Sequence, residues 1–84
     1  MTDKLTLRIL TPAGTAFDGS VDAVFLPGSA GAFEVLPGHA PIVSSLDGGR
    51  ILWRQDGKED SVAIRSGAII VEDNIVTVCA QRES

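Results

Sequence analysis

The stretch RILWRQDGKEDSVAI, residues 50–64, predicts a β-hairpin more clearly than any other part of the chain. Two runs of strand character flank the pair Asp56-Gly57. A two-residue Asp-Gly loop favours a type I′ turn, because such a turn needs positive φ at both central positions. Successive side chains of a strand point to opposite faces, so one set should face inward. That set consists of Ile51, Trp53, Val62 and Ile64.

Strand and turn signals continue on both sides of this hairpin. Residues 4–9 alternate strictly and have one apolar side, which predicts a half-buried strand. Further strands are expected at 15–18, 21–26, 42–46, 68–71 and 75–79, with a break at 66–67 and a frayed polar tail at 81–84. No stretch shows helical periodicity. The pattern predicts an all-β sandwich or barrel, and a chain of 84 residues forms one domain, residues 1–84.

Composition restricts the partners that this domain could have. The net charge is -4 and the seven Lys and Arg residues form no basic run, which argues against nucleic acid as a partner. The single cysteine, Cys79, excludes an internal disulfide and is expected in the core. The first ten residues are too polar for a secretion signal, and no apolar run is long enough to cross a bilayer. We expect a soluble protein that meets a membrane only through a complex.

The inventory of catalytic residues is small. The only histidine, His39, and the only cysteine are far apart in the sequence and too few for a zinc site. Ser44, His39 and Asp47 could form a triad on paper, but no G-x-S-x-G motif supports one. We therefore expect no catalytic residue, no cofactor and no metal. An interaction module is favoured over an enzyme and over a free-standing ligand-binding β module.

Residues 28–41, GSAGAFEVLPGHAP, are the best candidate for a binding element. Three glycines and two prolines specify the backbone closely, and apolar residues between them predict a short strand inside a shaped connection. Loops held on a rigid sheet often carry function, although a simple crossover loop would have the same composition. If Val24, Leu26 or Val43 is exposed, it would suit a permanent protein interface.

The longer stretch GSAGAFEVLPGHAPIVSSLDGG, residues 28–49, resembles the signature of the epsilon subunit of F-type ATP synthases, which leads into L-P-G-H-A-P. Residues 17–19 and 66–78 agree with the same family in order and spacing. The resemblance implies a flattened β-sandwich of about ten short strands. It also implies a non-catalytic rotor subunit of the central stalk, bound to the gamma subunit and to the polar loops of the c-ring during proton-driven ATP synthesis. Its location would be peripheral, on the cytoplasmic face of the bacterial inner membrane.

Site residues follow from the same resemblance, position by position. The candidates for the gamma interface are Thr11, His39 and Ser44. The candidates that face the c-ring are Gly31, Ala32, Phe33, Glu34 and Gly38. Relatives usually have an acidic residue at the position of Ala32, whereas here the acid stands at Glu34. No C-terminal helical pair follows the sandwich, so we expect no inhibition through such helices.

Overall fold

The computed structural model describes residues 4–83 and confirms the central hairpin. Strand β6 (Gly49–Gln55) pairs antiparallel with β7 (Lys58–Glu72). Asp56 and Gly57 between them have φ of 52° and 81°, as a type I′ turn requires. The four side chains expected to face inward, Ile51, Trp53, Val62 and Ile64, are all buried.

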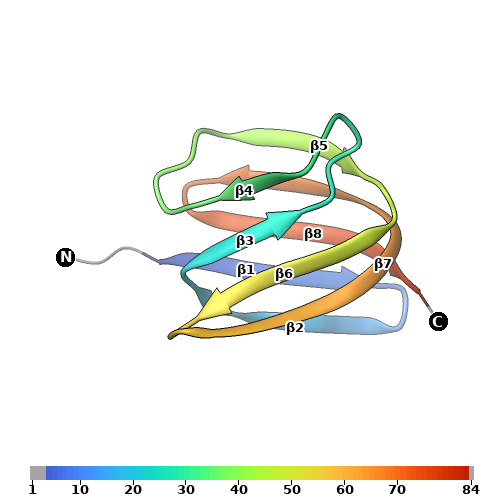
Figure 1. The fold of residues 1–84 in the computed structure, drawn as a ribbon, viewed down its shortest axis with the longest axis horizontal. Coiled ribbons are helices and arrows are strands. Elements are labelled where there is room, and N and C mark those ends of the chain that lie inside the picture. Colours follow the sequence, from blue (N-terminus) through green and yellow to red (C-terminus); the bar gives the residue numbers. More distant parts are fainter. Residues whose placement is uncertain (1–3, 84) are drawn as a thin grey trace.

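Strand β7 belongs to two layers of the domain. Its first half pairs with β6, and its second half lies between β5 (Ile42–Leu46) and β8 (Ile75–Arg82). Figure 1 shows this strand curving around one side of the molecule. The register shifts between Ile64 and Ser66, so the predicted break at 66–67 is a bend within one strand of 15 residues.

The remaining strands complete the two layers. They are β1 (Leu5–Thr11), β2 (Gly14–Val21), β3 (Ala23–Leu26) and β4 (Phe33–Val35). The β5 layer has the order β2-β1-β8-β7-β5, with β1 and β8 parallel, and the β6 layer has the order β7-β6-β3-β4. Within residues 4–83 there are eight strands, where about ten were expected, and no helix. The predicted all-β sandwich is confirmed.

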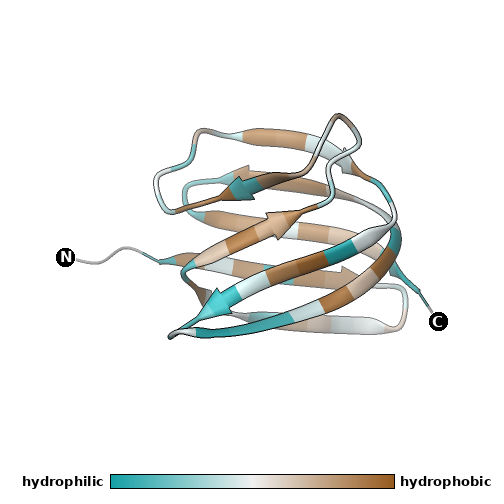
Figure 2. Cartoon of the chain, viewed as in Figure 1, coloured by the Kyte–Doolittle hydropathy of each residue, from teal (hydrophilic) through white to brown (hydrophobic). Residues whose placement is uncertain are grey.

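The space between the layers is filled with aliphatic side chains, and every buried side chain of residues 4–83 is apolar. Figure 2 shows the alternation of apolar and polar residues along the strands that produces this core. The rings of Phe17 on β2 and Trp53 on β6 lie 4.5 Å apart between their centroids and are tilted by 39°. The only tryptophan is therefore part of the core, as its position beside Ile51 predicted.

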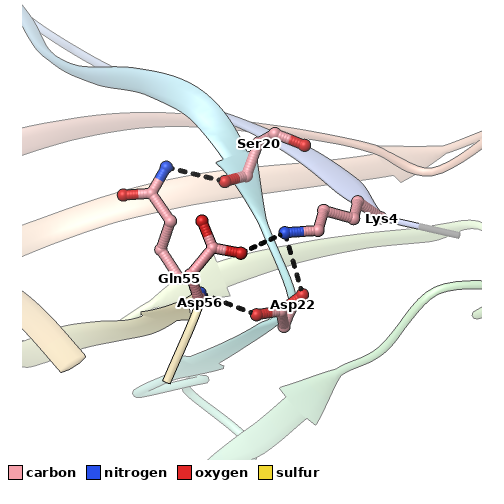
Figure 3. Close-up of polar contacts among 5 residues, drawn as sticks. All are labelled: Lys4, Ser20, Asp22, Gln55 and Asp56. Atoms are coloured by element: carbon pink, nitrogen blue, oxygen red, sulfur yellow. Dashed lines mark hydrogen bonds and ion pairs between the residues drawn. The ribbon is translucent and has the colours of Figure 1, made fainter. Parts of the chain in front are cut away.

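A polar cluster fastens the tip of the β6–β7 hairpin to the corner between β2 and β3 (Figure 3). The Gln55 side chain donates to the Ser20 carbonyl at 2.8 Å, and the Asp56 amide donates to Asp22 Oδ2 at 3.0 Å. Lys4 Nζ lies 2.7 Å from Asp56 Oδ1 and 3.4 Å from Asp22 Oδ1. The hydrogen bond from Lys4 lowers the pKa of Asp56, and the same bond raises the pKa of Lys4.

Three expectations are corrected. Cys79 is exposed, because β8 turns Val78 and Ala80 inward and the residue between them must face outward. Val24 and Leu26 are buried between the layers and are unavailable to a partner. Strand β8 continues to Arg82, where a frayed tail was predicted, because Arg82 pairs with Ile64 across the sheet.

Residues 1–3 and Ser84 lie outside the described residues. The beginning of the polar N-terminal stretch and the last residue of the predicted polar tail fall on them. Residues 4–83 contain no helix that is long and apolar enough to cross a membrane.

Candidate functional site

Residues 28–41, which we call the ledge, contain β4 and join β3 to β5 along the upper edge of the sandwich in Figure 1. The predicted short strand within a shaped connection is confirmed. Gly31 has φ of 136° and Gly38 has φ of 86°, in the region that glycine adopts readily. At Gly28 a Cβ atom would lie 2.6 Å from the Gly31 carbonyl and 2.7 Å from the Phe33 ring. The first turn of the ledge therefore requires glycine at position 28.

The beginning of the ledge is bonded to the end of β5. The Ser29 amide donates to the Ser45 carbonyl at 3.0 Å, and the Ser29 hydroxyl donates to Asp47 Oδ1 at 2.8 Å. The Ser45 hydroxyl donates in turn to Ser29 Oγ at 2.9 Å. The Asp47 amide closes the cluster by donating to the Pro27 carbonyl at 2.8 Å.

The end of the ledge is bonded to the turn between β7 and β8. The Gly38 amide donates to Asn74 Oδ1 at 2.7 Å, and the His39 amide donates to the Leu36 carbonyl at 3.1 Å. The His39 ring places Nδ1 2.8 Å from the Ala40 carbonyl, and a carbonyl can only accept, so Nδ1 carries the proton. Both ends of the ledge are thus fixed by residues distant in sequence.

The three gamma-interface candidates do not converge on one point. Thr11 ends β1, and its hydroxyl donates to the Gly14 carbonyl at 2.8 Å. Ser44 lies on β5, which β8 and β7 separate from β1. Its hydroxyl donates to the Ser45 carbonyl at 3.0 Å, and it is half-buried. His39 is half-buried on the ledge next to β5. All three belong to the β5 layer or to the loop that enters it.

The five c-ring candidates lie on the ledge but differ in exposure. Gly31, Ala32, Glu34 and Gly38 are exposed. Phe33 is half-buried and packs against the core. Ala32, Phe33 and Glu34 line a hollow of about 410 Å³ on the outer face of the β6 layer, together with Phe25, Leu26, Pro27, Arg50 and Leu52. Glu34 is the only charged residue among the five candidates, and Arg50 is the other charged residue that lines the hollow.

A second surface, with exposed apolar side chains, lies on the outer side of the β5 layer. Val43 on β5 is 82% exposed and lies opposite Ile70 on β7, which is 53% exposed. Ile70 lies opposite Thr77 on β8, and the neighbouring row pairs Ala68 with Cys79. We call this surface the outer β5 face; its residues are Val43, Ser45, Ala68, Ile70, Ile75, Thr77 and Cys79.

None of the seven side chains on the outer β5 face carries a charge at neutral pH in its ordinary protonation state. Charged side chains lie at its margins, at Glu72 on one side and at Arg8 on the other, where Arg8 Nε is 3.4 Å from Asp18 Oδ2. The sequence holds a signal for this face. Ile42-Val43 and Ile69-Ile70 are adjacent apolar pairs in strands, so one member of each pair has to face outward.

The triad considered from the sequence is not assembled. The hydroxyl of Ser44, the ring of His39 and the carboxylate of Asp47 are each bonded to a different neighbour, as described above. Among residues 4–83, no three His, Cys, Asp or Glu side chains are grouped so that they could hold a metal ion.

Comparison with known families decides the classification. The family model described as the ATP synthase delta/epsilon chain β-sandwich domain matches residues 4–83. The chain belongs to this family. The outer β5 face and the ledge are therefore features of a delta/epsilon chain β-sandwich domain.

Curated relatives of this delta/epsilon domain carry the name ATP synthase epsilon chain. The protein from Sulfurovum sp. (strain NBC37-1) is 49% identical over 76 residues, which is 89% of this chain and 59% of the relative. The protein from Synechococcus sp. (strain WH7803) is 43% identical over 75 residues, which is 89% of this chain and 55% of the relative. The chain thus spans less than two thirds of the length of these relatives.

Two solved structures share the fold of the delta/epsilon domain. A chain in the Euglena gracilis mitochondrial ATP synthase, a structure of OSCP, F1 and the c-ring, matches 92% of this chain and 50% of its own length, with a TM-score of 0.86 and 24% identity. A chain in the central stalk and c-ring structure of the Tetrahymena thermophila enzyme matches 95% of this chain and 65% of its own length, with a TM-score of 0.77 and 16% identity. At these identities the likeness shows the fold alone.

Proposed function

We propose that this domain acts as a non-catalytic rotor component in the central stalk of a proton-translocating F-type ATP synthase, linking the gamma subunit to the c-ring. Membership in the delta/epsilon family supports the proposal, as do the relatives named ATP synthase epsilon chain. The two epsilon chains named above come from bacteria, which supports a peripheral position on the cytoplasmic face of the inner membrane. Contact with the membrane would then be made only through the complex.

The outer β5 face is the observation that carries the proposal, as the surface for gamma. Val43 and Ile70 present adjacent apolar side chains, and uncharged residues surround them. A permanent interface has an apolar centre and a polar rim, and this face has that arrangement with Glu72 and Arg8 at its margins. His39 lies on the ledge next to β5 and Thr11 at the far end of the same layer, so the gamma contact would extend along the layer, whereas Ser44 alternates with Val43 and Ser45 and lies on the opposite side of β5.

The ledge is proposed as the contact with the c-ring. Of the five candidates on it, Gly31, Ala32, Glu34 and Gly38 are exposed, while the packing of Phe33 and the hydrogen bond of the Gly38 amide anchor it to the domain. A ring of polar loops suits the hydrogen-bonding groups of an exposed backbone and one carboxylate better than it suits an apolar surface. Glu34 stands two residues after Ala32, the position at which relatives usually carry an acid. Because two steps along a strand return to the same face, the Glu34 carboxylate would still face the ring.

Rigidity of the ledge fits a part that transmits force. Ser29 and Asp47 bond one end of the ledge to β5, and Asn74 bonds the other end to the β7–β8 turn. Pro37 and Pro41 restrict the backbone between these points. A segment that is ordered before binding loses less conformational entropy when it docks.

A free-standing ligand-binding β module is the other reading of the sequence. Such a module usually presents aromatic side chains in a concave site. Here Trp53 is buried in the core and Phe17 packs against its ring. The aromatic residues left at the surface hollow, Phe25 and Phe33, are themselves half-buried. The structure thus favours protein contact.

Co-purification with the gamma subunit tests the proposal. The full chain carrying an affinity tag is co-expressed with gamma from the same genome, and tagged chain expressed alone serves as the control. We expect gamma to elute with the chain in equal amounts. Recovery of the chain without gamma, while gamma remains soluble and folded in the same lysate, would contradict the proposed place in the stalk.

A further inference from the structure

The turn between β7 and β8 is built from Asp73 and Asn74, which have φ of 52° and 62°. Positive φ at both central positions is the geometry of a type I′ turn, and the second position is most often glycine. Asparagine tolerates this backbone, but the turn does not need an amide side chain. The side chain of Asn74 is therefore free to serve another purpose.

That side chain reaches the ledge. Asn74 Oδ1 accepts a hydrogen bond from the Gly38 amide at 2.7 Å, across a separation of 36 residues. A backbone amide can only donate, so the contact requires the oxygen of the Asn74 amide and fixes its orientation. Gly38 has φ of 86°, a conformation that glycine adopts without strain and that most other residues avoid.

The backbone of Asn74 holds a second element. Its carbonyl accepts from the Thr6 amide of β1 at 2.8 Å, and the next residue, Ile75, begins β8 on the outer β5 face. One residue thus contacts the ledge through its side chain and the β5 layer through its main chain. It joins the segment proposed to meet the c-ring to the sheet proposed to meet gamma.

We propose that Asn74 is a positioning residue that holds the 36–41 segment of the ledge in the orientation in which His39, the gamma candidate within it, meets gamma. The docking part of this inference rests on the proposed function. The bond itself does not, because it can be measured in the isolated chain. A merely structural role in the turn predicts a different result, since glycine would support the turn equally well.

Two substitutions separate these roles. Asn74→Gly keeps a residue suited to positive φ and removes the acceptor, while Asn74→Asp keeps an acceptor oxygen and also tolerates positive φ. Amide exchange at Gly38 is measured by NMR in the full-length chain, with amides of β6 as an internal reference. We expect Asn74→Gly to accelerate exchange at Gly38 by about fivefold or more, from the loss of one hydrogen bond, and Asn74→Asp to stay near the parent chain.

The same variants are then titrated with gamma, beside a Val43→Asp variant that tests the outer β5 face. We expect Asn74→Gly to bind gamma more weakly by severalfold, and Asn74→Asp to restore binding. Unchanged exchange at Gly38 in Asn74→Gly, or equal acceleration in both variants, would overturn the positioning bond. Normal gamma affinity in Asn74→Gly would overturn its role in docking, while weaker binding by Val43→Asp in that experiment would show that the outer β5 face still meets gamma. The proposed function itself fails only if the parent chain does not bind gamma in the same titration.

Discussion

Val43 on β5 and Ile70 on β7 are direct partners across the sheet, and both side chains face solvent, with 82% and 53% of their surface exposed. Cross-strand apolar pairs normally stabilise a sheet by packing against each other and against a covering layer. Here no covering layer of the domain lies over the pair, and its outer side is exposed to solvent. A contiguous apolar surface of this kind on a small domain marks a protein contact, which is why this pair is central to the proposed function.

Exposure of Cys79 makes the outer β5 face accessible to a chemical probe. Cys79 lies opposite Ala68 on this face, so its thiol should react with a soluble thiol reagent in the native chain. If gamma covers the face, the rate of reaction should fall by at least about tenfold in the complex. The rate is followed by absorbance or mass spectrometry with and without gamma. An equal rate in a complex shown to be intact would place gamma elsewhere.

Gly28 should not tolerate even one added methyl group. The new Cβ would lie 2.6 Å from the Gly31 carbonyl, so Gly28→Ala should lower the free energy of unfolding by about 1–3 kcal/mol through crowding. Gly48→Ala is the matched control, because its nearest neighbour, the Arg65 carbonyl, would be 3.2 Å away. Urea unfolding followed by the fluorescence of buried Trp53 measures both variants. Equal loss in the two variants would refute the tight turn at Gly28.

The Lys4–Asp56 pair predicts a pH dependence of stability. The pKa of Asp56 is lower in the folded chain, so the pair stabilises the fold above the unfolded-state pKa of about 3.9 and this effect is lost as the pH falls through the folded value. The raised pKa of Lys4 means that its contribution is lost only as the pH rises through its own folded value, in the alkaline range. At neutral pH both groups are charged and the pair is intact.

Asp56→Asn tests this dependence, because asparagine also tolerates the positive φ at position 56. The variant should unfold at a lower urea concentration than the parent chain at pH 7 in low salt, and the difference should shrink as the pH falls through the lowered pKa of Asp56. The side chain of Asp56 is 77% exposed, so the difference should be small and should shrink as salt is added. A difference that persists unchanged as the pH falls through that pKa would show that the ion pair is not its source.

Local signals in the sequence predicted much of the fold. Asp56-Gly57 fixed the type I′ hairpin, because only a few residues adopt positive φ at both positions, and the alternation around it identified which side chains face inward. The continuity of β7 could not be predicted in this way. Ser66-Gly67 favours a break, and only the partners β5 and β8 on its two sides show that the strand continues through a bulge.

The candidate site was predicted in outline and not in detail. The composition of residues 28–41 indicated a shaped connection, but the bonds that hold it come from Asn74 and Asp47, which no local pattern associates with it. The inward or outward direction of a strand with adjacent apolar residues depends on register. This is why Cys79 was assigned to the wrong environment, and why the sequence left open which of Val24, Leu26 and Val43 is exposed; only Val43 is.

Binding of gamma to chains that carry one new charge tests the central claim most directly. Val43→Asp places a carboxylate in the centre of the outer β5 face, and Leu52→Asp places one on the outer face of the β6 layer, where Leu52 is 36% exposed. Both variants are first confirmed to be folded by thermal unfolding and then titrated with gamma in a calorimeter. We predict that Val43→Asp weakens binding by at least about tenfold, because its charge must be desolvated, and that Leu52→Asp binds like the parent chain. Normal binding by Val43→Asp, or loss of binding in Leu52→Asp alone, would contradict the assignment of the outer β5 face to gamma.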